Sequence, residues 1–574
     1  MTEPSQSLLH RDSENKEQRR ASQPSESSTG ESSVIKNEEY ADYAELSYQS
    51  GIWIEDEHSA SQVNEDVQSL FDRKHLGLAV NYACSGFFNG LLPAMIYPFF
   101  KLFLNMHSYQ VAAATSFISL PAAYKTLFGI LTDNYPVLGY RRKSYMIIGW
   151  LIAFVAWMCL SFGPREEAYY EPGEIRRTSV SADRVVQNPH APESGTWYLV
   201  LIMVSFLGVG ITDVACDGIT VELAQQEPIE QRGSIQATTF VLRFSGKLVG
   251  TVLSVVCFNG DEYGGTFEWS VPYRKVFFGC GVLTLMGAIS TAILLVEKRD
   301  DSDAEAHPFR QMWRIVQQRA VWQMMTVLFV NAFTSNFGFA GQHAIQEYWA
   351  RVVPLSNSVG RCVAVFLSVA TFAVVKAHCL NTSWRTLIVC AALLHASVNL
   401  SVNSLTALNV IRKQWFFLSG PVLSAISDSV RFVIGGFVAV EVAEHHFESA
   451  TMSLLMTVYN MATLLATSSF NFVDSFFDVS DANISHDTPH VRHEVVLCLA
   501  ISAIVELLGL VALPFHPRQK RDAQDLKRNG GSSRAAGMIA LLLVVLVTIW
   551  ATFISLLSIG SSTACLRLAG GRGC

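Results

Sequence analysis

The sequence has 574 residues, of which 50% are hydrophobic and only 16% are charged, with a net charge of -7. A soluble chain carries about 25% charged residues, so this composition argues against an ordinary soluble protein. The charge offers no basic patch for a nucleic acid, and the eleven cysteines follow neither a disulfide nor a zinc spacing, so we expect no metal site and no cofactor.

Residues 1–75 are polar and rich in Ser, Glu, Gln and Lys. They lack the apolar core of a cleavable signal peptide. Such a composition cannot bury enough apolar surface to fold. We therefore predict a disordered cytoplasmic N-terminal tail over this range.

Apolar runs begin at residue 76, and each has about 20 residues or more, enough to cross a ~30 Å hydrocarbon core as a helix. The predicted spans are 76–100, 109–131, 145–163, 197–216, 234–258, 275–296, 322–345, 359–377, 386–408, 415–440, 452–477 and 494–514. This pattern predicts an all-α, multi-pass membrane protein with about 12 transmembrane helices.

The spacing of the spans divides the chain into two halves of six helices. They form a first bundle over 76–296 and a second bundle over 322–515, joined by a cytoplasmic linker, 297–321. Beyond them the sequence predicts a basic loop at 516–536, an additional transmembrane helix at 537–559 and a C-terminal tail at 560–574.

Lys and Arg in the loops predict the orientation in the membrane. Arg141, Arg142 and the basic residues of 297–321 and 516–536 share one side, which favours a cytoplasmic N-terminus in the plasma membrane or an internal membrane. Asn483 begins an Asn-Ile-Ser sequon on the opposite side, so it is a candidate for glycosylation.

A short internal match supports two related halves. Val221–Ala224 resembles Val440–Ala443, which pairs Glu222 with Glu441 at the ends of the fourth and tenth predicted helices. Repeated halves around a midplane site are typical of secondary transporters.

Gly129 and Asp133 stand four residues apart at the end of the second predicted helix, before a tight turn and the basic residues Arg141 and Arg142. Glycine allows two helices to approach, and the aspartate can pair with a basic residue or cap a neighbouring helix. This spacing predicts a gate, although the basic residues can also be simple topology anchors.

Asp213 and Asp217 are spaced i, i+4 on the fourth predicted helix, so they share a face, and Glu222 follows. Two carboxylates so close favour binding of a shared proton. The alternative is that Glu222 and Asp217 sit in interfacial water and pair with Arg232.

Lys125 and Arg243 lie within apolar helices, where a charge faces a cavity or a partner. Arg243 can pair with Asp213 or Asp217. Lys125 has no acidic neighbour in the sequence, so it can offer its charge to an anionic solute; a structural pair or snorkelling is the alternative.

Polar residues of the second half give weaker signals. Asp428 and Arg431 stand three residues apart and can form an intrahelical pair. Asn331, Asn336 and Gln342 can bind a solute or neighbouring helices, whereas His445 and His446 diverge on a helix and do not suit a metal.

The stretch Pro121-x-x-x-Lys125-x-x-x-Gly129-x-x-x-Asp133-x-x-Pro136-x-x-Gly139-Tyr-Arg-Arg resembles the signature of the folate–biopterin transporter family of the major facilitator superfamily. The block from Asp213 to Ala224 and the run from Arg243 to Gly250 agree with it. The resemblance implies two six-helix bundles around a central cavity, alternating access and a folate or pterin-like solute.

The sequence thus predicts a secondary active transporter of a small organic solute, not an enzyme, with proton coupling. Its expected partners are the bilayer, protons and a solute that can be anionic, and no nucleic acid. The alternatives are a transporter-like membrane sensor that signals through the N-terminal tail and, less favoured, a membrane-bound enzyme.

Overall fold

The computed structural model describes residues 70–106, 111, 117–118, 120–174, 184–299 and 307–559. Most of the predicted N-terminal tail, the start of the second predicted helix, part of the linker and the tail at 560–574 lie outside these residues. Within them the chain is helical, with isolated bridges such as Val137 to Tyr140 in place of named strands.

The described part of the first half contains five helices long and apolar enough to cross a membrane, together with the shorter segment η3–α4. They are α2 (Leu76–Ile96) with its π-helical extension η2 (Tyr97–Phe103), η3 (Leu120–Tyr124) leading into α4 (Lys125–Asn134), α5 (Lys143–Phe162), α7 (Gly195–Gln225), α8 (Ser234–Cys257) and α9 (Tyr273–Leu294). Short 3₁₀ turns, η5 (Ala191–Ser194) and η6 (Asp261–Tyr263), lie in the loops.

The second half follows the amphipathic helix α10 (Pro308–Gln317), which lies in the predicted linker. Its elements are α11 (Arg319–Ser335), α12 (Gln342–Ala344), η7 (Ile345–Trp349), α13 (Pro354–Val374), η8 (Val375–Cys379), α14 (Trp384–Ala407), α15 (Gln414–Val442), α16 (Glu448–Asp474), α17 (Asp481–His486), α18 (Pro489–Leu508) and η9 (Gly509–Phe515). The chain continues through α19 (Lys520–Asn529) to α20 (Arg534–Ile559).

Among the described residues, ten helices are long and apolar enough to cross a membrane. The predicted seventh span, 322–345, is wrong in one respect, because α11 ends at Ser335 and the chain leaves the helix before α12. The Asn336 side chain there bonds back to the Ala332 carbonyl at 2.8 Å, and Gly338 follows, so the helix is not continued. The fourth helix, α7, is longer than predicted and carries both Asp217 and Glu222.

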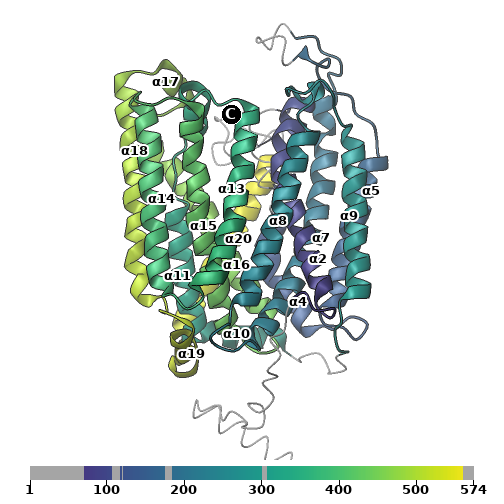
Figure 1. Ribbon diagram of the computed structural model, residues 1–574, viewed down its shortest axis with the longest axis vertical. Coiled ribbons are helices and arrows are strands. Elements are labelled where there is room, and N and C mark those ends of the chain that lie inside the picture. Colours follow the sequence, from purple (N-terminus) through teal and green to yellow (C-terminus); the bar gives the residue numbers. More distant parts are fainter. Residues whose placement is uncertain are drawn as a thin grey trace, which may run out of the picture. The chain divides into compact units, whose positions relative to one another are not determined.

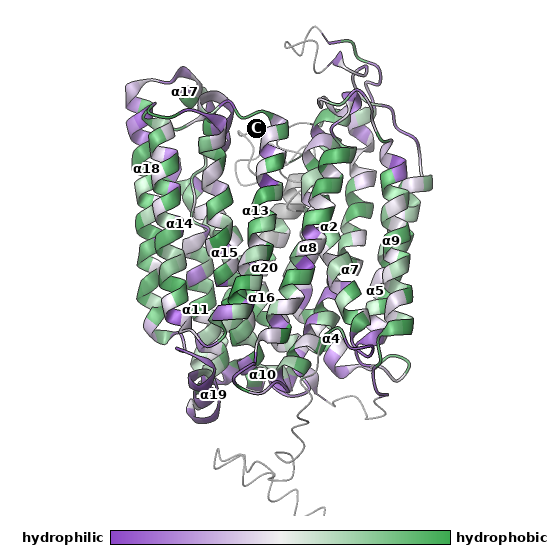
Figure 2. Ribbon diagram, in the orientation of Figure 1, coloured by the Kyte–Doolittle hydropathy of each residue, from purple (hydrophilic) through white to green (hydrophobic). Residues whose placement is uncertain are grey.

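The helices of the first half stand together on one side of the view in Figure 1, and those of the second half stand on the other. The halves meet where α4 packs against α16 and where α8 packs against α13. In Figure 2 the helix bodies are mainly hydrophobic, whereas α19, at one end of the bundles, is strongly hydrophilic. This is the pattern expected of helices that span a bilayer.

Close packing of α2 on α8 positions the centre of the first half. Gly246 of α8 lies against the backbone of Ala83, where a side chain would collide with the Ala83 carbonyl oxygen. Small residues allow membrane helices to approach in this way. The approach brings Tyr82 of α2 beside Arg243 of α8, with the guanidinium carbon 4.8 Å from the ring centroid.

The additional helix α20 lies along the junction between the halves. It packs against α10, α11 and α16 of the chain's second part and against η3 of the first half. The Tyr124 and Thr552 hydroxyls are 3.0 Å apart across the latter contact. The predicted helix at 537–559 therefore exists and begins slightly earlier, at Arg534.

Candidate functional site

Four charged side chains meet inside the first half, where α4, α7 and α8 come together. Lys125 Nζ is 2.8 Å from Asp213 Oδ2. Arg243 Nη2 is 2.7 Å from Asp213 Oδ1 and 2.8 Å from Asp217 Oδ1. These four residues, here called the first-half cluster, place two cations against two carboxylates. Pairing of this kind offsets the cost of burying the charges.

Hydroxyl groups from α2 complete the first-half cluster. Tyr82 donates a hydrogen bond of 2.8 Å to Asp217 Oδ1, and Ser85 donates one of 2.9 Å to Asp213 Oδ1. Sequence reasoning missed both residues, because they precede their partners by 135 and 128 positions. No local spacing connects residues so far apart.

The predicted geometry of the carboxylates agrees with the structure, since one nitrogen of Arg243 contacts both Asp213 and Asp217. The expectation that Lys125 lacks an acidic partner is wrong, because Asp213 reaches it from a helix 88 positions later in the chain. Lys125 remains the most accessible member of its pair, with 19% of its side chain exposed against 5% for Asp213. Solvent therefore reaches the lysine more than the carboxylate.

The predicted gate residues join the two halves at the start of α16. Asp133 Oδ2 accepts a 2.7 Å hydrogen bond from the Ala450 amide, and Asp133 Oδ1 is 3.4 Å from Arg142 Nη2. Arg142 also contacts Glu448 Oε2 at 2.6 Å. A carboxylate at a helix N-terminus interacts favourably with its exposed amides. Asp133 thus caps α16 and binds a basic residue in the same conformation.

Gly129 lies one turn before Asp133 and faces α16. A β-carbon at this position would come 2.7 Å from both the Ala450 Cα and the Ser449 carbonyl oxygen. Backbone atoms cannot yield as a flexible side chain does, so only glycine permits this contact. The close approach is what allows Asp133 to reach the Ala450 amide.

Arg141 and the two adjacent histidines make further contacts beside the predicted gate residues. Arg141 Nη1 is 3.0 Å from His446 Nδ1, and Nη2 donates to the His446 carbonyl at 3.0 Å. His445 Nδ1 lies 3.1 Å from Glu448, and this hydrogen bond raises the pKa of His445. In the sequence the two histidines were considered only as metal ligands. Their contacts with Arg141 and Glu448 were not predicted.

Glu222 binds a different arginine from the one considered in the sequence. It pairs with Arg142 at the gate, whereas Arg232 lies 3.3 Å from Glu441 Oε2. The interpretation that Arg232 neutralises Glu222 and Asp217 is therefore wrong. Both glutamates of the internal match, Glu222 and Glu441, nevertheless lie beside an arginine near the junction of the halves.

Arg431 also has a partner other than the one considered. Its Nη2 is 2.5 Å from Glu506 Oε1 on α18, so the intrahelical pair with Asp428 is not the contact made. Glu506 in turn lies 2.7 Å from His395 Nδ1. Of the amides expected to bind a solute or neighbouring helices, Gln342 donates to Asn403 of α14 at 3.1 Å, whereas Asn336 bonds back to Ala332 of its own helix.

The two groups of helices and their junctions define a fold known from solved structures. The structure of the proton:xylose symporter XylE, of the major facilitator superfamily, superposes with a TM-score of 0.51 at 10% identity, covering 76% of this chain and 93% of that one. The predicted fold class is confirmed: this is an integral, multi-pass membrane protein with the major facilitator fold.

Sequence comparisons place the chain more narrowly. Residues 85–174 match the model of the BT1 family. The folate-biopterin transporter of Synechocystis sp. is 22% identical over 445 residues, covering 73% of this chain and 78% of that protein. Folate transporter 1 of Plasmodium falciparum is 20% identical over 426 residues, covering 72% and 75%. The predicted resemblance to the folate–biopterin transporter family is confirmed, and the chain is a membrane transporter of a small solute, not an enzyme.

Proposed function

We propose that the protein is a secondary active transporter that carries a folate or pterin-like anion by alternating access, coupled to protons. The observation that carries the proposal is the Lys125–Asp213 pair, a partly exposed cation held by a buried carboxylate. The names of the relatives from Synechocystis and Plasmodium support the solute class. The gate supports the mechanism.

Contacts between the halves support alternating access. The polar contacts that join α4, α5 and α7 to the α15–α16 turn include Asp133 to Ala450 and Arg142 to Glu448. Lys376 Nζ bonds to the Thr238 hydroxyl at 2.7 Å near the same end, where Figure 1 places α4 and α10. A transporter closed at this end exposes its solute site toward the other.

Charge balance in the first-half cluster supports proton coupling. Lys125 and Arg243 balance Asp213 and Asp217, so a solute carboxylate that takes Lys125 adds one negative charge to a shielded site. A proton on Asp213 removes that excess, because the neutral acid no longer needs Lys125. Proton binding and solute binding are therefore expected to favour each other.

Substitution of Lys125 tests the proposal. Lys125→Ala should lower folate uptake at least about tenfold, while Arg243 still binds Asp213 and Asp217 and the protein still reaches the membrane. Lys125→Arg should keep part of the uptake, since the guanidinium differs in shape. Labelled folate uptake and surface protein are measured together, with Lys275→Ala, an exposed lysine at the start of α9, as control.

Two outcomes would contradict the proposal. Normal surface protein with normal uptake in Lys125→Ala would remove Lys125 from the pathway. Folate uptake by the unaltered protein that stays constant between about pH 5 and 8 under an imposed pH gradient would remove proton coupling. Loss of surface protein in Lys125→Ala would instead assign the pair a structural role.

A further inference from the structure

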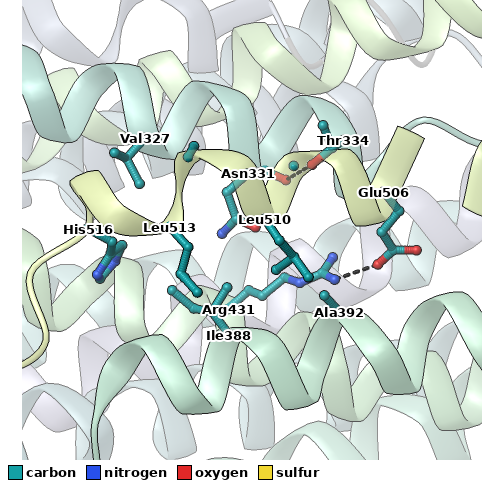
Figure 3. Close-up of a pocket in the computed structure, with 12 residues that line it drawn as sticks. Val327, Asn331, Thr334, Ile388, Ala392, Arg431, Glu506, Leu510, Leu513 and His516 are labelled. Atoms are coloured by element: carbon teal, nitrogen blue, oxygen red, sulfur yellow. Dashed lines mark hydrogen bonds and ion pairs between the residues drawn. The ribbon is translucent and has the colours of Figure 1, made fainter. Parts of the chain in front are cut away.

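A second group of ionisable side chains lies where α14, α15 and α18 meet. Glu506 Oε2 is 2.7 Å from His395 Nδ1, and Glu506 Oε1 is 2.5 Å from Arg431 Nη2. The side chains of Glu506 and Arg431 are only 5% and 4% exposed, whereas that of His395 is 16% exposed. Figure 3 shows Arg431 reaching toward Glu506 from the neighbouring helix. The histidine is therefore the member that water reaches.

This carboxylate stands between two cavities. The larger one has a volume of about 320 Å³, and its wall includes His395, Asn399 and Glu506. The smaller one has about 20 Å³, room for one water, and is lined by Arg431, Asn331 and Glu506. Asn336 and Asn403 on the same wall give water hydrogen-bond partners, so a cavity of this size can hold water that delivers a proton to His395.

The charges around His395 balance only when either His395 or Asp428 carries a proton. The charged and titratable groups facing it are Glu506 from α18 and Arg431 and Asp428 from α15, with Tyr459 of α16 close to Asp428. Two carboxylates thus face one guanidinium. The first-half cluster has two fixed cations for its two carboxylates, so the second group differs by one missing positive charge.

The hydrogen bonds of His395 leave one nitrogen able to accept that charge. Nδ1 faces the Glu506 carboxylate and must donate to it, since an ionised carboxylate only accepts. Nε2 lies 3.0 Å from the Asn399 amide nitrogen, which donates to it in the neutral ring. Rotation of the Asn399 amide would present its oxygen instead, an acceptor for a protonated Nε2.

We propose that His395 is the proton-binding site of the second half, distinct from the first-half cluster. The proton passes from water in the 320 Å³ cavity to Nε2, and Asn399 turns its oxygen toward the new N–H. The group around Glu506 then reaches charge balance, and the cavity becomes more favourable to an anion. The transport consequence rests on the proposed function, but proton binding at His395 does not.

Transport by the full-length protein in proteoliposomes provides the first test. In His395→Gln, proton-driven accumulation of labelled folate should fall at least about tenfold, while exchange of labelled for unlabelled folate, which needs no net proton movement, should continue. The control is His490→Gln, since His490 is 68% exposed beside Asp478. Accumulation by His395→Gln with an unchanged pH profile would overturn the proposal.

Asn399→Asp provides the second test, and it remains informative if His395→Gln fails to fold. A carboxylate at this position stabilises a protonated Nε2, so the pH of half-maximal proton binding should rise by about one unit or more. NMR titration of the imidazole resonances of the purified protein without solute follows His395 separately from the added carboxyl group. If the unaltered protein takes up no folate, the proposed solute is wrong. The titration then still tests whether His395 binds a proton. A titration unmoved by Asn399→Asp would overturn the proposal.

Discussion

Glu227 occupies a buried position in the turn between α7 and α8. Its carboxylate accepts hydrogen bonds from the Gly233 amide at 2.8 Å and the Ile235 amide at 3.0 Å, at the start of α8. Burial raises the pKa of Glu227 from 4.5 to about 7, although these two bonds oppose the shift. Ionisation of Glu227 therefore lowers the stability of the folded protein.

Glu227→Gln should raise the thermal stability of the protein more at alkaline pH than at acidic pH. A carboxyl group with a raised folded-state pKa loses stability as pH rises from about 4.5 to about 7, because folding then requires a buried charge. Glutamine removes that charge but keeps only one of the two oxygens that accept from the amides. We expect the Tm of Glu227→Gln, relative to that of the parent, to be about 1–3 °C higher at about pH 8 than at about pH 5.

The exposed neighbour Glu230 offers a matched control in the same turn. Glu230→Gln should leave Tm unchanged at both pH values, since its charge is already in water. The outcome that contradicts this prediction is a difference in Tm between Glu227→Gln and the parent that does not change with pH. Ionisation of Glu227 would then cost the folded protein little.

At the level of elements, the contact of α4 with α16 depends on the absence of a side chain at Gly129. Gly129→Ala should separate these helices, because the new β-carbon meets the α16 backbone. Gly210→Ala is the matched control, since nothing lies within 4 Å of a β-carbon there. Thr451 on α16 is fully buried, so a cysteine in its place reports the opening.

We expect labelling of Thr451→Cys by a water-soluble thiol reagent to accelerate at least about tenfold in Gly129→Ala, in a background from which the eleven native cysteines are removed. The same cysteine with Gly210→Ala should react at the parent rate. Equal rates in both backgrounds would mean that the gate tolerates the methyl group.

The gate also shows how far sequence reasoning extends. Gly129, Asp133 and Arg142 were predicted because they lie within fourteen positions of one another, and a short motif carries that signal. Their partner Ala450 lies 317 positions from Asp133, so no spacing could indicate it. Long apolar runs predicted the helices because a helix must contain about 20 apolar residues to cross the hydrocarbon core of a bilayer. The break after Ser335 was missed because Phe337 and Phe339 prolong the hydrophobic run, although Asn336 and Gly338 disfavour a helix there.

At the level of the whole molecule, the sequon and the basic helix lie at opposite ends. Figure 1 shows α17, which carries Asn483, at the end of the bundles away from α19. α19 contains Lys527 and Arg528 in its last turn, and such residues favour the cytoplasmic side. Asn483 should therefore face the lumen or the exterior.

Expression in a cell with a secretory pathway should attach a glycan to Asn483, visible as a mobility shift that a glycosidase removes. Asn483→Gln should abolish the shift, and Lys275→Ala should not. A tag beside residue 483 that is reached only from the cytosol would reverse the orientation and place the gate on the opposite face.

The position of α20 bears on which parts of the protein move as a body. Toward the second half it packs along α10, α11 and α16, whereas toward the first half its described contact is with η3, including Tyr124 to Thr552. When the halves rock, the smaller contact should yield first. α20 would then move together with the second half, so the two bodies that rock against each other would differ in size. Its contact surface on η3, which directly precedes Lys125, would be the place where the two bodies slide past each other.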